Sequence, residues 1–164
     1  MTQQEYENKI KELQDELEQL KAAKIEAERP KRWKPKYRDT YYYVDNLMIV
    51  DDDEWDEASV DEWRYITGNC FKTREEAEEY KKQIEYTARY KNYIEEHSEP
   101  IDWKDTNTKK YVAQFDFACN EIAFGIYLFH KQQGSIYASS KQVIEDAIKE
   151  IGEDNFKKYV LGVK

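Results

Sequence analysis

The stretch TGNCFKTREEAEEY, residues 67–80, marks the point where a strand ends and a helix begins. A glycine-led loop around Cys70 would suit a reactive thiol, but the residues after it predict the start of a helix instead. Thr73 and Glu76 have the spacing of a capping box, in which the hydroxyl and the carboxylate accept hydrogen bonds from backbone amides of the first turn. Apolar residues at helical spacing then predict a helix that continues to about His97.

The same pattern returns 66 residues later in the chain. It has the glycine, the aromatic residue and the helix cap in the same order, and its members Gly134, Tyr137, Ser139 and Gln142 match Gly68, Phe71, Thr73 and Glu76. A second helix is therefore expected after Ser139, with Gly152 placed to end it. Cys70 aligns with Ile136 in this comparison, which predicts a core position. We expect Cys119 to be a core residue as well, because lone thiols in apolar patterns are often buried.

Strand-like runs precede each predicted helix. Before the first helix they are residues 40–44, 47–50 and 60–66, with an acidic loop at 51–57; before the second they are residues 110–118, 122–129 and 135–138. We predict an α+β fold in which an N-terminal coiled-coil helix is followed by an antiparallel sheet. The sheet is built from two related strand–strand–strand–helix units, about residues 39–97 and 109–164, and the helices pack on one of its faces.

Residues 1–29 are predicted to form the coiled-coil helix. Neither glycine nor proline occurs between Gln3 and Arg29, and apolar residues step by four and three along Tyr6, Ile10, Leu13, Leu17 and Leu20. This is heptad spacing. A lone helix with so narrow an apolar stripe is marginal in water, so we expect self-association to cover it, with packing on the rest of the chain as the alternative. Pro30 ends the helix, and residues 30–38 are expected to be a stiff basic linker.

The composition favours a folded, soluble protein. The 164 residues carry a net charge of -9, and the aromatic fraction of 15% is too high for a disordered chain. No apolar run of about 18 residues and no secretory leader is seen, so we expect no membrane span and a cytosolic location.

Four segments together resemble a small domain common in phages and prophages of Gram-positive bacteria. They are WKPKYRDTYYY, GNCFKTREEAEEY, the Asp102-Trp103 pair followed by KKYV, and the ending IYASSKQVIEDAIKEIGEDNFKKYVLGV. The resemblance covers residues 33–164. It implies an origin in a mobile genetic element and a place in the cytoplasm of a bacterial host, and it implies no chemistry.

Catalytic and metal-binding patterns are missing from the sequence. His97 and His130 are the only histidines, and neither has a second ligand at metal spacing. Asp51, Asp53 and Glu62 fall at EF-hand positions one, three and twelve, but the glycine that position six requires is missing. No phosphate loop or nucleophile motif occurs. We therefore expect no enzyme activity, no bound metal and no cofactor.

Two oppositely charged segments remain as candidate binding surfaces. Residues 45–62 contain nine acids and no lysine or arginine, and the acidic surface expected there consists of Asp51, Asp52, Asp53, Glu54, Asp56, Glu57, Asp61 and Glu62. The basic aromatic arm consists of Lys31, Arg32, Trp33, Lys34, Lys36, Tyr37 and Arg38. The two segments could also simply neutralise each other, since exposed ion pairs need no function.

The favoured hypothesis is a non-catalytic phage or prophage accessory protein that acts by protein–protein interaction. In its specific form the acidic surface enters the basic groove of a host nucleic-acid-targeting defence enzyme, as an anti-CRISPR protein does, and inhibits it. The partner is then a host or phage protein, and the protein self-associates through its N-terminal helix. The alternative is a single-stranded nucleic-acid-binding protein that stacks bases on the basic aromatic arm.

Overall fold

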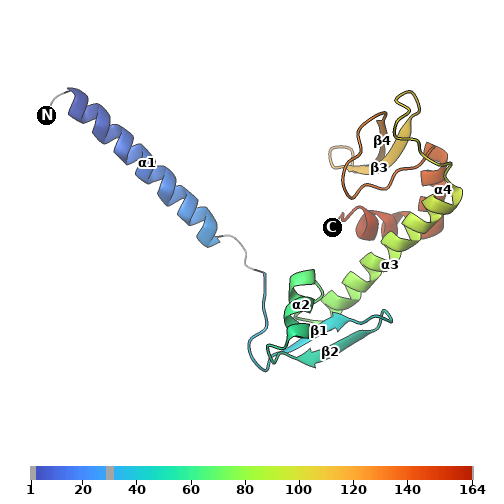
Figure 1. The fold of residues 1–164 in the computed structure, drawn as a ribbon, viewed down its shortest axis with the longest axis horizontal. Helices are drawn as coiled ribbons and strands as arrows, with labels where there is room; N and C mark the ends of the chain where they lie inside the picture. Colours follow the sequence, from blue (N-terminus) through green and yellow to red (C-terminus); the bar gives the residue numbers. More distant parts are fainter. Residues whose placement is uncertain (1–2, 29–31, 164) are drawn as a thin grey trace. The chain divides into compact units, whose positions relative to one another are not determined.

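The computed structural model describes residues 3–28 and 32–163 of the chain. The chain divides into two compact units, Met1–Lys34 and Pro35–Lys164. Helix α1 (Gln3–Glu28) lies in the first unit, and the second holds all the strands and the other helices of the described residues (Figure 1). The predicted α+β class and the N-terminal helix are confirmed.

The second unit begins with an antiparallel hairpin. Strand β1 (Thr40–Val44) pairs with β2 (Val50–Glu54), and the turn between them takes residues 45–49. The Asp45 carboxylate accepts hydrogen bonds from the backbone N–H groups of Leu47 and Ile49 and so holds them in the turn. The predicted strand at 47–50 and the predicted acidic loop at 51–57 are therefore wrong, because the acidic residues themselves form most of β2.

Residues Ser59–Thr67 form helix α2 where a third strand is predicted for 60–66. The sequence fits both periods, because Val60, Trp63 and Ile66 also have helical spacing. Before the helix, the Asp56 carboxylate accepts a hydrogen bond from the backbone N–H of Ala58. The helix ends at Gly68, whose φ of 88° is left-handed and favours glycine.

The capping box at the start of α3 (Arg74–His97) is confirmed. The Thr73 hydroxyl accepts from the backbone N–H of Glu76 at 3.2 Å, and the Glu76 carboxylate accepts from the backbone N–H of Thr73 at 3.3 Å. With 24 residues the helix is about 36 Å long.

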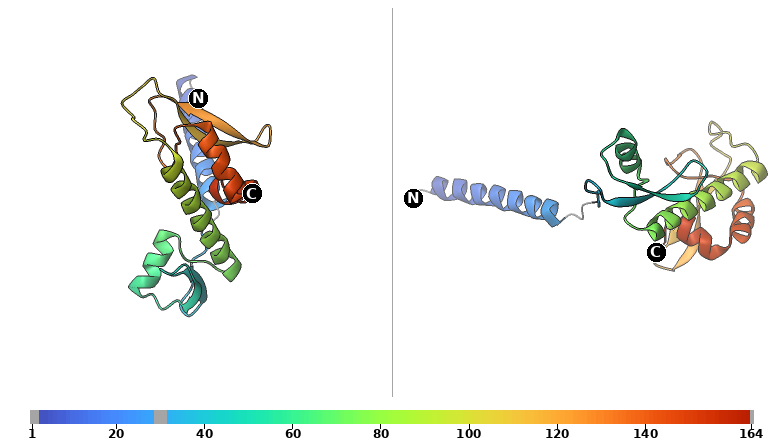
Figure 2. Two further views of the ribbon diagram at one scale, coloured as in Figure 1. Left: turned by 90° about the vertical axis from the view of Figure 1, so that its right-hand side faces the viewer. Right: turned by 90° about the horizontal axis from the view of Figure 1, so that it is seen from below.

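The second hairpin is confirmed, with β3 (Lys110–Asp116) paired to β4 (Glu121–Tyr127). It forms its own two-stranded sheet in the described residues, so the single sheet of the prediction is replaced by two. The reason is the length of α3, since the hairpins lie at opposite ends of that helix (Figure 2).

Helix α4 (Lys141–Ile151) starts one residue later than predicted. Its cap is Ser140, whose hydroxyl accepts from the backbone N–H of Val143 at 3.3 Å, and not Ser139. The Gln142 amide donates to Asp146 instead of completing a capping box. Gly152 ends α4 as predicted, with φ of 87°. A short turn α5 (Glu153–Asn155) and a π-helical turn η1 (Phe156–Val160) follow it.

The two halves of the second unit do share a pattern, at an offset of 67 residues instead of 66. Phe71 and Ala138 each form a bridge to the first strand of their own hairpin, and each lies two residues before the helix cap, Thr73 or Ser140. At this offset Cys70 corresponds to Tyr137, and both are buried.

Two clusters of the hydrophobic core lie along α3. Near its start, Ala77 packs with Val44 and Val50 of the first hairpin. Near its end, Tyr90 and Ile94 pack with residues of β3, α4 and η1 in a larger cluster. Helix α3 therefore supports both hairpins, and the first of them carries the acidic surface.

Candidate functional site

The four acidic side chains of β2, Asp51–Glu54, are all exposed. Asp53 forms an ion pair of 2.9 Å with Arg64, whereas no cation of residues 32–163 pairs with Asp52, Glu54 or Glu57. In the part of the chain that the structure describes, no strand pairs with the outer edge of β2. Asp51 and Asp53 lie on one face of β2 and Asp52 and Glu54 on the other, and all four carboxylates are open to solvent beside this unpaired edge.

A cluster of polar and aromatic side chains joins β2 to α2 through β1. The Tyr41 hydroxyl donates to Asp61 at 2.7 Å, and Arg64 donates to the Tyr41 hydroxyl at 2.6 Å and to Asp53 at 2.9 Å. The Arg64 guanidinium also lies 3.4 Å from the centroid of the Tyr43 ring. The cluster fixes the position of α2 beside the acidic strand.

Asp61 is not part of the acidic surface, because its side chain is buried, with an exposed fraction of 2%. Burial alone would raise the pKa of Asp61, but hydrogen bonds from the Tyr41 hydroxyl and the backbone N–H groups of Asp56 and Ala58 outweigh it and hold that pKa below its ordinary value. Burial and the bond to Asp61 raise the pKa of the Tyr41 hydroxyl. Asp61 is therefore an ionised structural residue, and the half-buried Glu62 beside it lies at the border of the surface.

The outer face of α2 is apolar and exposed. Val60, Trp63 and Ile66 have exposed fractions of 47%, 65% and 66%. The sequence prediction missed this stripe because it assigned residues 60–66 to a strand. The spacing of three residues between its members is the signal that would have identified it.

The basic aromatic arm is divided by the boundary between the two units. Lys31 lies outside the described residues, Arg32, Lys34, Lys36, Tyr37 and Arg38 are exposed, and Trp33 is half-buried. The backbone N–H of Arg38 donates to the carbonyl of Trp55 at 2.8 Å, so the last part of the predicted linker is bound to the hairpin and is not a free spacer.

Within α1, the predicted heptad positions Ile10, Leu13, Leu17 and Leu20 are 51–62% exposed. The side chain of Tyr6 lies outside the described residues. An apolar stripe of this kind is typical of a helix whose partner is another helix.

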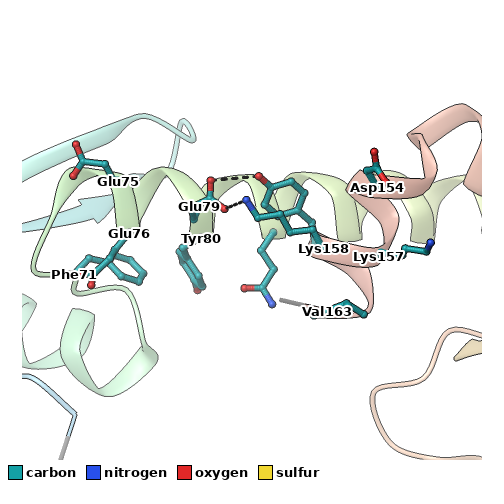
Figure 3. A pocket seen from close by; sticks show the side chains of 12 residues that line it. Phe71, Glu75, Glu76, Glu79, Tyr80, Asp154, Lys157, Lys158 and Val163 are labelled. Atoms are coloured by element: carbon teal, nitrogen blue, oxygen red, sulfur yellow. Dashed lines mark hydrogen bonds and ion pairs between the residues drawn. The ribbon is translucent and has the colours of Figure 1, made fainter. Parts of the chain in front are cut away.

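A pocket of about 810 Å³ lies between α3 and the C-terminal segment (Figure 3). Phe71, Tyr80 and Tyr159 line it, and Glu79 lies among them as a charged residue. Glu79 accepts hydrogen bonds from Lys158 at 2.7 Å and from the Tyr159 hydroxyl at 3.3 Å. The hydrogen bond from Lys158 keeps the pKa of Glu79 below its ordinary value, so this carboxylate is a weak base.

The two cysteines differ in their exposure to solvent. Cys70 is buried, as predicted, whereas Cys119 is exposed, which contradicts the prediction of a core residue. Cys119 lies in the turn between β3 and β4, where its backbone N–H donates to the Asp116 carboxylate.

Within residues 3–28 and 32–163, no group of three or more histidine, cysteine, aspartate and glutamate residues could hold a metal ion. Among the same residues, no helix combines the length and the apolar character that crossing a membrane requires. Comparison with protein-family models, with curated proteins and with solved structures gives no match to this chain.

Proposed function

We propose that this protein is a non-catalytic phage or prophage accessory protein that acts by protein–protein interaction in the cytoplasm of a bacterial host. Its contact surface consists of the exposed carboxylates of β2 and the turn after it, Asp51–Glu54, Asp56 and Glu57, and α1 joins copies of the chain. The observation that carries the proposal is the row of carboxylates on β2, of which the described cations neutralise only Asp53.

The specific form of the proposal is an inhibitor of a nucleic-acid-targeting defence enzyme of the host. Consecutive residues of a strand are about 3.3 Å apart and their side chains alternate between its two faces, so β2 carries a line of two carboxylates, about 6.6 Å apart, on each face. A basic groove that accepts phosphates would be attracted to such a line.

Capture of partners from host lysate tests the proposal. The variant Asp52→Lys, Glu54→Lys, Glu57→Lys changes three exposed carboxylates that no described cation pairs with, and it leaves Asp53 and Asp61 in their cluster. The matched control Glu85→Lys, Glu96→Lys, Glu99→Lys makes the same change of charge at exposed positions on and just after α3.

We expect the wild type and the control to capture a protein that survives nuclease treatment, and the β2 variant to lose it. Raising the salt concentration should weaken the capture, because exposed charges are screened within about 10 Å at 0.1 M. Equal capture by all three proteins, or loss of every partner after nuclease treatment, would contradict the proposal.

A single-stranded nucleic-acid-binding protein is the second candidate, and one observation favours it. Tyr37 is exposed, and the Arg38 guanidinium lies 5.6 Å from its ring centroid, beside the exposed Lys36. An aromatic ring flanked by cations can stack on an unpaired base. In this case Lys36→Glu with Tyr37→Ala should reduce binding of a single-stranded oligonucleotide in fluorescence anisotropy, and the β2 variant should bind more tightly.

A further inference from the structure

Helix α2 has its polar face inside and its apolar face outside. Asp61, Arg64 and Tyr65 share the face that packs on β1, where their groups contact Tyr41, Tyr43 and Trp55. Val60, Trp63 and Ile66 therefore lie on the opposite face, and each is about half exposed or more. Scattered exposed apolar residues are ordinary, but three on one helix face form a candidate binding site, and tryptophan is enriched among the residues that dominate binding energy.

Two carboxylates of β2, Asp51 and Asp53, lie on the same side of the hairpin as α2. Asp53 and Asp51 are directly opposite Tyr41 and Tyr43 in the hairpin, so all four side chains lie on the sheet face that α2 covers. Arg64, which follows Trp63 in the chain, reaches Asp53. This pair neutralises Arg64, and residues 45–62 before it contain no lysine or arginine.

We propose that the outer face of α2 and the carboxylates on the same side of the hairpin, Asp51 and Asp53, form one docking site for a cationic amphipathic segment of a protein partner. Such a segment has large apolar side chains that cover Val60, Trp63 and Ile66, and lysines or arginines beside them that reach the carboxylates. This proposal rests on the proposed function, because it names the chemistry of the partner for the same surface.

Charge decides against a second copy of this chain as the occupant. Two copies that met through this surface would bring together their segments of nine acids without a lysine or arginine. Helix α1 is not a suitable occupant of this site either, because it is acidic itself: it has eight acids and only four lysines in the sequence QQEYENKIKELQDELEQLKAAKIEAE. A partner with net positive charge avoids this repulsion.

Selection from a random peptide library displayed on phage tests the inference with the full-length chain as bait. We expect enrichment of peptides that combine lysine or arginine with large apolar residues. A synthetic copy of an enriched peptide should bind at least about tenfold more weakly to Trp63→Ala with Ile66→Ser, the loss typical of removing a central aromatic anchor. The control Phe117→Ser removes an aromatic residue with an exposed fraction of 80% from the other hairpin and should bind as the wild type does.

The remaining outcomes overturn the inference. These are no enrichment, enrichment of neutral or acidic peptides, enrichment of sequences that match residues 29–38 of this chain, or equal binding by the Trp63 variant. If the β2 variant loses its lysate partner while the Trp63 variant keeps the same partner, the docking site fails and the proposed function stands. If both the β2 variant and the Trp63 variant still capture the lysate partner, the proposed function fails as well.

Discussion

The carboxylate of Asp61 lies at the centre of the contact between β1 and α2. It accepts hydrogen bonds from the Tyr41 hydroxyl at 2.7 Å and from the backbone N–H of Asp56 at 3.0 Å. A buried charge of this kind is stable only when its oxygen atoms are hydrogen-bonded. Asp61 therefore contributes to the position of α2 and of the stripe on its outer face.

The substitution Asp61→Asn should lower the free energy of unfolding at pH 7 by about 1–3 kcal/mol, because an amide has one acceptor oxygen and leaves at least one donor to the Asp61 carboxylate unpaired. The pKa of Asp61 is lower in the folded protein than in the unfolded chain. The stabilising effect of the Asp61 carboxylate is therefore fully present when the pH is above the pKa of Asp61 in the unfolded chain. It is lost as the pH falls through the lower pKa of Asp61 in the folded protein. Urea denaturation should show the difference between wild type and variant shrinking from about pH 5 downward. A constant difference at all pH values, or an equal effect of Asp52→Asn on the exposed strand, would contradict this role.

At the scale of single elements, α3 and α4 both begin with a side-chain helix cap, which is a complete capping box in α3 and a single hydrogen bond in α4. Thr73 and Glu76 form both hydrogen bonds of a capping box. Ser140 forms only the bond to Val143, whereas the neighbouring Ser139 accepts from the backbone N–H of Glu99 at 3.0 Å and so ties α4 to the loop after α3.

The substitution Ser140→Ala should therefore cost about 1 kcal/mol of stability, and Ser140→Asn should restore most of it, because asparagine is an equally good helix cap. Thermal unfolding followed by circular dichroism measures both. Changes at Ser139 should not follow this order, since its hydroxyl bonds to the loop. If alanine and asparagine differ at Ser139 and not at Ser140, the cap is assigned to the wrong residue.

At the scale of the whole molecule, the second unit contains both core clusters along α3, while the apolar stripe of α1 is exposed. Deleting residues 1–34 should therefore leave a monomer that unfolds cooperatively, and the full chain should be an oligomer by light scattering at tens of micromolar. Leu13→Glu with Leu17→Glu should act like the deletion, because it places like charges in the predicted seam.

The control for the Leu13 and Leu17 substitutions is Gln14→Glu with Gln19→Glu, which adds the same charge to α1 at positions outside its apolar heptad stripe. This variant should remain an oligomer. A monomeric full-length protein, or an oligomer that survives the Leu13 and Leu17 substitutions, would show that α1 does not join copies of the chain.

The sequence by itself determined the features that depend on neighbouring residues. Helix α1, the capping box at Thr73, the hairpin of β3 and β4 and the end of α4 at Gly152 are all where the prediction places them. Each is set by local rules of spacing, propensity and capping, so a short window contains all the information that it needs.

Only the tertiary structure decided the features that depend on contacts between distant residues. The segment 60–66 fits a strand and a helix equally well, and the helix is selected where Asp61 and Arg64 reach Tyr41, about twenty residues earlier. The same contacts bury one acid of the expected acidic surface and expose Trp63. Local propensity differs between such alternatives by about 1 kcal/mol or less per residue, whereas leaving the buried Asp61 charge without its hydrogen-bond partners would cost several kcal/mol, so the long-range contacts decide.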